Sequence, residues 1–89
     1  MTKAEKLHLS KVAAIGCIIC GGMAEIHHLR TGQGMGKKAT HYDAIPLCPS
    51  HHRTGNHGIA FHAGKQAFEA NYGTQQELLI KTNELLKFN

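Results

Sequence analysis

The chain opens with a pattern typical of an amphipathic helix. Thr2 and Glu5 have the spacing of a capping box, in which each side chain accepts a hydrogen bond from the backbone N–H of the other residue. Apolar residues then recur near helical spacing, at Leu7 and Val12 among others, and Gly16 is suited to end a helix. We therefore predict a helix that ends before Gly16. A disordered basic segment is the alternative, because chain termini fray easily.

Two short extended segments are predicted in the middle of the chain. Residues 23–29 alternate briefly between apolar and polar types, and residues 41–47 form a second segment whose strand character is limited by Pro46. Pro49 then suits the first turn of a helix, which residues 54–58 break or bend. The predicted order is therefore strand, loop, strand, helix.

Two further helices are predicted toward the C-terminus. Residues 64–72 have a helical pattern and end at Gly73, a natural C-terminal cap. Thr74 and Glu77 repeat the capping-box spacing and open the last helix. Its apolar face consists of Leu78, Leu79, Thr82, Leu85 and Leu86. We interpret both helices as scaffolding, with recognition of a partner as the rarer use of such a face.

The length of 89 residues, 42% of them apolar, fits one small domain with a thin core. We divide it into an N-terminal helix over 1–16, a central unit over 17–62 and C-terminal helices over 63–89. No apolar run reaches the roughly 18 residues of a membrane span, and no secretory leader is visible. We therefore expect a cytoplasmic protein without a membrane partner. The net charge of +4 and the pI near 9.2 favour a polyanionic partner, to which protonated histidines would add.

Three cysteines and one histidine have the spacing of a structural zinc site. Cys17 and Cys20 are separated by two residues, and Cys48 and His51 repeat this gap. Four soft or borderline ligands predict one tetrahedral structural Zn²⁺. An odd number of cysteines argues against a disulfide framework, and a thioredoxin-like dithiol would need a βαβ setting that this pattern lacks. The remaining alternative is Cys48 as a small buried apolar residue with His51 on the surface.

The glycine-rich stretch 31–40 contains Lys37 and Lys38, which suits a loop that follows a phosphate backbone. It resembles a P-loop only superficially, because the spacing is one residue short and Lys38 stands where Ser or Thr would hold magnesium. A plain solvated linker is the alternative.

A second group of histidines lies outside the predicted zinc set. His27 and His28 end the first predicted strand. Neighbouring strand residues face opposite sides, so one of them can bind an ion while the other faces an attacking water molecule. Without the rest of the chain, two unrelated surface imidazoles would be the simpler interpretation.

The paired histidines, the stretch from Asp43 to Cys48 and the stretch from Cys48 to His52 together resemble the HNH nucleases of the ββα-metal superfamily. The chain is similar to the phage recombination-enhancement (Ref) branch of RecA-dependent nucleases, through Cys-Ile-Ile-Cys-Gly-Gly, His-His-Leu-Arg, Gly-Gln-Gly-Met-Gly and Ala-Ile-Pro-Leu-Cys-Pro-Ser-His-His-Arg. The resemblance covers Cys17 to Leu86 and implies the α+β class, with a small ββα-metal finger, a zinc knuckle and flanking helices. It further implies a phage-derived enzyme in the cytoplasm of a bacterial host, which nicks DNA that RecA-type recombinase filaments have opened into displacement loops.

Carried over by position, the resemblance implies roles for four residues. His27 corresponds to a metal ligand and His28 to the general base, while the helix supplies His52 as a second ligand. Asp43 stands where the HNH signature has its middle asparagine, which departs from the strict pattern. An aspartate can accept a hydrogen bond from the other imidazole nitrogen and raise the basicity of His28, or it can bind metal instead.

The third ligand falls near Asn56 or His57. On an unbroken helix Asn56 shares the face of His52, whereas His57 is turned by a further 100° or so. We favour His57 because imidazole is the better ligand for zinc-like metals, provided that Gly55 lets the chain leave helical geometry. His62 is the reserve candidate.

These roles imply hydrolysis of a DNA phosphodiester bond. Neutral His28 takes a proton from the attacking water. One catalytic divalent ion, Mg²⁺, Mn²⁺ or Zn²⁺, bound by His27, His52 and His57, stabilises the leaving oxygen. Phosphate contacts that do not depend on DNA sequence are expected from Arg30, Lys37, Lys38 and Arg53.

The rival interpretation is a non-catalytic zinc-binding module that docks on DNA or on a protein. It accounts for the cysteines equally well, but it leaves the histidines beyond the zinc set unexplained. The number of bound ions separates the two interpretations, because one ion favours the module and two favour the nuclease.

Overall fold

Within residues 2–29 and 42–87, which the computed structural model describes, two short strands are flanked by helices. In chain order the elements are α1 (Lys3–Ile15), β1 (Glu25–His28), β2 (Ala44–Leu47), the π-helix η1 (Ser50–Thr54), the 3₁₀-helix η2 (Phe61–Ala63), α2 (Lys65–Tyr72) and α3 (Gln75–Lys87). The predicted α+β class is confirmed at this level. The glycine-rich stretch 31–40 lies outside the described residues.

The predicted capping boxes are present at two helix starts. Thr2 Oγ1 accepts the Glu5 N–H at 3.1 Å, and Glu5 Oε1 accepts the Thr2 N–H at 2.7 Å. The same pair of bonds joins Thr74 and Glu77 at 2.9 and 3.1 Å, ahead of α3. Each box satisfies backbone donors that the first helical turn leaves without an intrahelical partner, so both helices begin where the side chains predict.

The two strands pair antiparallel, and this pairing brings the central residues of the chain together. Ile45 lies opposite His27, and Ala44 lies opposite His28. All four residues of β2 are buried, including Pro46, whose carbonyl accepts the N–H of Ile18 at 2.9 Å. This bond ties the segment that follows α1 directly to the sheet.

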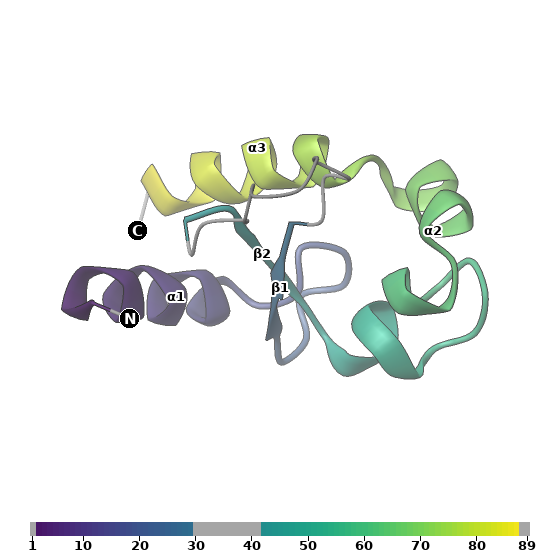
Figure 1. Cartoon of the computed structure of the whole chain (residues 1–89), viewed down its shortest axis with the longest axis horizontal. Coiled ribbons are helices and arrows are strands. Elements are labelled where there is room, and N and C mark those ends of the chain that lie inside the picture. Colours follow the sequence, from purple (N-terminus) through teal and green to yellow (C-terminus); the bar gives the residue numbers. More distant parts are fainter. Residues whose placement is uncertain (1, 30–41, 88–89) are drawn as a thin grey trace, which may run out of the picture.

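The helices meet the sheet from two directions, as Figure 1 shows. Helices α1 and α3 both contact β2 and also contact each other. The short helices η1 and η2 follow the C-terminal end of β2, and α2 connects them to α3 (Figure 1). The sheet therefore lies between a pair of long helices and a unit of short ones.

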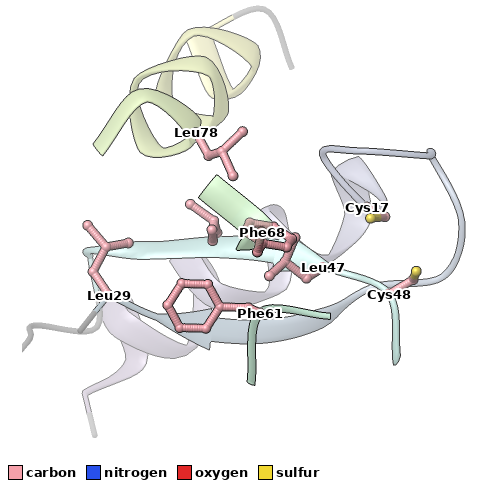
Figure 2. Packing of buried hydrophobic residues seen from close by; sticks show 8 residues of the cluster. Cys17, Leu29, Leu47, Cys48, Phe61, Phe68 and Leu78 are labelled. Atoms are coloured by element: carbon pink, nitrogen blue, oxygen red, sulfur yellow. The ribbon is translucent and has the colours of Figure 1, made fainter. Parts of the chain in front are cut away.

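The hydrophobic core is small and continues into the predicted zinc site. Figure 2 shows Leu78 of α3 packed over Leu47 and Phe68, with Phe61 beneath them. Buried members of this cluster are Cys17, Leu29, Ile45, Leu47, Cys48, Phe61, Phe68 and Leu78. Two thiols thus belong to the core itself, at one end of the cluster (Figure 2).

The helix expected after Pro49 differs from the prediction. Ser50–Thr54 is a π-helix, closed by a 3.0 Å hydrogen bond from the Gly55 N–H to the Ser50 carbonyl. A β-carbon on Gly55 would collide with that carbonyl oxygen, so the tight closure depends on glycine. The wider turn carries His51 and His52 close to the end of β2.

No helix among the described residues combines the length and the apolar character that crossing a membrane requires.

Candidate metal centres

The first cluster unites the four residues that the cysteine spacing singles out. Cys17 and Cys20 lie in a tight turn after α1, where the Gly21 N–H donates to the Cys17 carbonyl and the Cys17 N–H donates to the Gly22 carbonyl, both at 2.8 Å. Gly21 has a φ of +78°, which favours glycine. Cys48 follows β2 and His51 lies in η1. The segment before β1 and the segment after β2 therefore meet in this cluster, at the end of the sheet where Glu25 pairs with Leu47.

The distances within this Cys/His cluster suit a tetrahedral ion. Cys17 Sγ lies 3.7 Å from His51 Nδ1, and Cys20 Sγ lies 3.7 Å from Cys48 Sγ. Metal–sulfur bonds of about 2.3 Å and metal–nitrogen bonds of about 2.0 Å place tetrahedral ligand atoms roughly 3.5–3.8 Å apart. Cys48 Sγ and His51 Nδ1 are closer, at 3.1 Å. All four ligand atoms lie within 4.8 Å of one another, so this cluster can hold a metal ion, and its donor set fits zinc.

The free state of the cysteines and the lowered pKa of the Cys17 thiol fit metal binding better than a disulfide. All three cysteines, which lie within the described residues, are free. Burial raises the pKa of the Cys17 thiol, but hydrogen bonds from the backbone at Cys48, Cys20 and Ile19 favour the thiolate, and the net pKa lies below its ordinary value. A thiolate is the form of cysteine that binds metal.

A second cluster brings together ring nitrogens of His27, His52 and His62, all within 4.8 Å of one another. Nε2 of His52 and Nε2 of His62 lie 3.1 Å apart. His27 is 2% exposed and packs its ring on Phe61, with a centroid distance of 4.4 Å. The three residues come from β1, η1 and η2, so the cluster forms only when these elements are assembled.

His27 and His52 have hydrogen-bond partners outside the cluster. His27 Nε2 lies 3.1 Å from Oε1 of Gln75, a buried side chain at the start of α3. His52 Nδ1 lies 3.0 Å from Oε1 of Glu25, the first residue of β1. Partners of this kind fix the orientation and tautomer of metal-binding imidazoles in proteins.

Glu25 also pairs with Arg53. Arg53 Nη2 lies 2.7 Å from Glu25 Oε2, and Arg53 Nε lies 3.0 and 3.2 Å from the two carboxylate oxygens. The hydrogen bonds from Arg53, and then that from His52, lower the pKa of the Glu25 carboxyl to about 2. Glu25 is therefore an anion at neutral pH.

The structure brings His62, and not His57, to the other two histidines. His57 is exposed, and its Nδ1 lies 3.2 Å from the Ala63 carbonyl oxygen. The carbonyl of Asn56 accepts backbone N–H groups of the following turn, at 2.9 and 3.1 Å. The chain leaves helical geometry at Gly55, as the sequence requires for a ligand beyond His52, but it then runs on to the reserve candidate. The metal-binding role of each residue stays a prediction.

His28 and Asp43 lie at the same end of the sheet. His28 is the last residue of β1, and its register partner Ala44 directly follows Asp43. The Asp43 carbonyl accepts the Leu29 N–H at 2.9 Å, which holds the two chain segments together beyond the strands. His27 faces the core, and strand alternation turns its half-buried neighbour His28 to the other side. The roles of His28 as base and of Asp43 as its orienting group are untested.

The predicted phosphate contacts divide into two groups. Arg53 is exposed and tied to Glu25. The other three residues, Arg30, Lys37 and Lys38, lie outside the described residues.

Sequence reasoning missed Glu25 and Gln75. Glu25 precedes His27 by two residues in a strand and so shares its face, a signal that the periodicity of β1 contains. Gln75 had no such signal, because its distance of 48 residues from His27 is bridged only by the packing of α3.

Comparison with known proteins places the chain in a family without a described activity. Residues 2–86 match the family described as protein of unknown function DUF968. The chain is also 37% identical over 68 residues to the uncharacterized protein YdfU of Escherichia coli (strain K12). That alignment covers 73% of this chain and 18% of YdfU, so the chain spans less than a fifth of this relative. Because the family match covers nearly all of its residues, the chain belongs to the DUF968 family.

Proposed function

We propose that this protein is a metal-dependent DNA endonuclease of the HNH type, with a ββα-metal finger, one structural zinc ion and one catalytic divalent ion. The convergence of His27, His52 and His62 beside a separate Cys/His cluster is the observation that carries the proposal. A structural zinc ion with four ligands needs no further imidazole, so a purely structural protein leaves these three histidines without a use. The order of two paired strands followed by η1 supports the same conclusion.

The proposed substrate is DNA, bound chiefly through its phosphates. A net charge of +4 favours a polyanion, and phosphate contacts give affinity that falls steeply with salt and varies little with base sequence. The sequence resemblance to the Ref branch extends the proposal to DNA opened by RecA-type filaments in a bacterial cytoplasm. Exclusive cleavage of RNA would count against this assignment.

In the proposed reaction, His28 accepts a proton from the water that attacks phosphorus. Asp43, next to the register partner of His28, holds the imidazole in the orientation that this transfer needs. His27, His52 and His62 would hold the divalent ion, and His62 takes the role first given to His57. When bound, the ion supplies Lewis-acid stabilisation of the leaving oxygen.

The test is nicking of supercoiled plasmid and of recombinase-opened DNA, with metal content measured on the same samples. Wild-type protein should carry two ions and nick DNA. His28→Ala should keep both ions and its circular dichroism, yet cut about 10²–10⁴-fold more slowly, the usual contribution of a positioned proton acceptor. His8→Ala removes a histidine of α1 outside both clusters and should cut at the wild-type rate.

Two outcomes would overturn parts of this proposal. Wild-type protein that carries one ion, or that carries two ions and cuts no form of DNA, would make the binding module the better interpretation. A His28→Ala variant that cuts at the wild-type rate would instead remove only the base assignment, and His27 or Asp43 would become the next candidate.

A further inference from the structure

The carboxylate of Glu25 lies between a candidate metal ligand and an exposed cation. Its Oε1 is 3.0 Å from His52 Nδ1, and its two oxygens receive three contacts from Arg53 between 2.7 and 3.2 Å. His52 and Arg53 are neighbours in η1, whereas Glu25 opens β1. One side chain from the sheet therefore fixes two consecutive side chains of the π-helix.

The first of these contacts decides which nitrogen of His52 faces the histidine cluster. An ionised carboxylate can only accept hydrogen bonds, so the proton of a neutral His52 ring resides on Nδ1. Nε2 then carries the lone pair, and Nε2 is the atom that lies 3.1 Å from His62 Nε2. Glu25 thus selects the tautomer that a metal ligand needs at this position.

The second contact orders Arg53 without using all of its donors. The guanidinium meets Glu25 through Nε and Nη2, while Nη1 carries two more N–H groups, and the side chain is 57% exposed. An arginine whose charge is already paired adds little long-range attraction for DNA. Its fixed planar fork can still bind a phosphate oxygen in a defined geometry.

We propose that Glu25 is a positioning residue that holds His52 toward the metal ion and Arg53 toward the phosphate bound there. This inference rests on the proposed nuclease function and assigns Arg53 to the reacting phosphate, not to sequence-independent binding along the DNA. It predicts that loss of Arg53 lowers kcat more than it raises KM. A general phosphate contact would show the opposite pattern, with weaker binding and a smaller salt dependence.

The experiment uses protein with zinc in the Cys/His cluster and Co²⁺ titrated into the second site, followed by its visible absorption. Glu25→Ala should weaken Co²⁺ binding about 10–100-fold, as losses of outer-shell carboxylates typically do. Glu25→Gln should weaken it less, because its amide oxygen still accepts a hydrogen bond from Nδ1. Glu84→Gln, an exposed carboxylate of α3, is the matched control and should bind Co²⁺ normally.

The kinetics of nicking of supercoiled plasmid test the second half of the proposal, the role of Arg53. Arg53→Gln should bind Co²⁺ like wild type and keep its KM, while kcat falls at least tenfold. Arg53→Lys should not restore kcat, because an ammonium group cannot make two parallel contacts with the carboxylate. Glu25→Gln should lower kcat in the same way, since it releases Arg53.

Failure of this inference is distinguishable from failure of the nuclease proposal. If wild type binds Co²⁺ and cuts DNA, but Glu25→Ala and Arg53→Gln do both equally well, only the positioning role is overturned. The positioning role is also overturned if Glu25→Ala loses zinc from the Cys/His cluster and its melting temperature falls in proportion to its loss of activity. Glu25 would then be a structural residue only. Wild type that binds no second ion overturns both proposals together.

Discussion

His51 and His52 are adjacent, yet each belongs to a different cluster. Successive residues in a helical turn point in directions roughly 100° apart, so one backbone segment can present one ring to each side. His51 Nδ1 reaches the thiols, while His52 Nε2 reaches His62. A small displacement of the His51–His52 backbone should therefore change the geometry of both clusters at once.

The choice between His62 and His57 is testable by metal binding. His62→Ala removes one of three converging imidazoles. It should lower the affinity for the second ion by more than the roughly 10–100-fold that is typical when a hydrogen-bond partner of a metal ligand is lost. His57→Ala is the matched control, because its ring contacts the Ala63 carbonyl and not the cluster. Isothermal titration calorimetry of the zinc-loaded proteins with Mn²⁺ or Co²⁺ measures the affinity of each variant for the second ion. Weaker binding in His57→Ala alone would restore the earlier assignment.

At the scale of single residues, the sequence predicts those contacts that depend on short spacing along the chain. Cys17 and Cys20, or Cys48 and His51, converge because two intervening residues form one turn, and the structure groups all four. Gln75 was not predictable, because its contact with His27 depends on where a distant helix docks. His62 could only be a reserve candidate, since its approach follows from the irregular path after Gly55.

Among the elements, η1 departs most from the prediction. Pro49 predicts the first turn of a helix that carries His51 and His52, and the structure contains a five-residue π-helix there. A π-turn is rare and has no simple local sequence signal, and here it is closed by the bond from the Gly55 N–H to the Ser50 carbonyl. The capped helices α1 and α3 were predictable because their start signals are local.

Gly55→Ala tests whether this turn positions His52. The new methyl group would collide with the Ser50 carbonyl oxygen and lie 2.9 Å from Ile59 Cγ2, so the π-helix must open. We expect a loss of about 1–3 kcal/mol in unfolding free energy and weaker binding of the second ion. Thr54→Ala, at an exposed neighbouring position, should change neither. Thermal melting and metal titration provide the measurements, and an unchanged second site in Gly55→Ala would contradict the role given to η1.

For the whole molecule, the small core leads us to expect that zinc bound in the Cys/His cluster would be a major source of stability. Cys17→Ala should unfold much of the domain, because structural zinc contributes about 10–16 kcal/mol in small domains whose total stability is about 5–15 kcal/mol. A strong chelator should do the same to wild type, and added zinc should reverse it. Far-ultraviolet circular dichroism and the melting temperature report the change. A Cys17→Ala protein with native values of both would show that zinc has no structural role.

A zinc ion bound in this cluster would also link parts of the chain that are far apart in sequence. Cys17 and His51 are 34 residues apart, and the segment between them contains both strands. A cross-link there closes a long loop, and a permanent one of this size would remove about 4 kcal/mol of chain entropy from the unfolded state. Unlike a disulfide, this closure is reversible and follows mass action. The fraction of chains that fold should therefore rise and fall with the free zinc concentration, so that metal supply itself limits how much native protein exists.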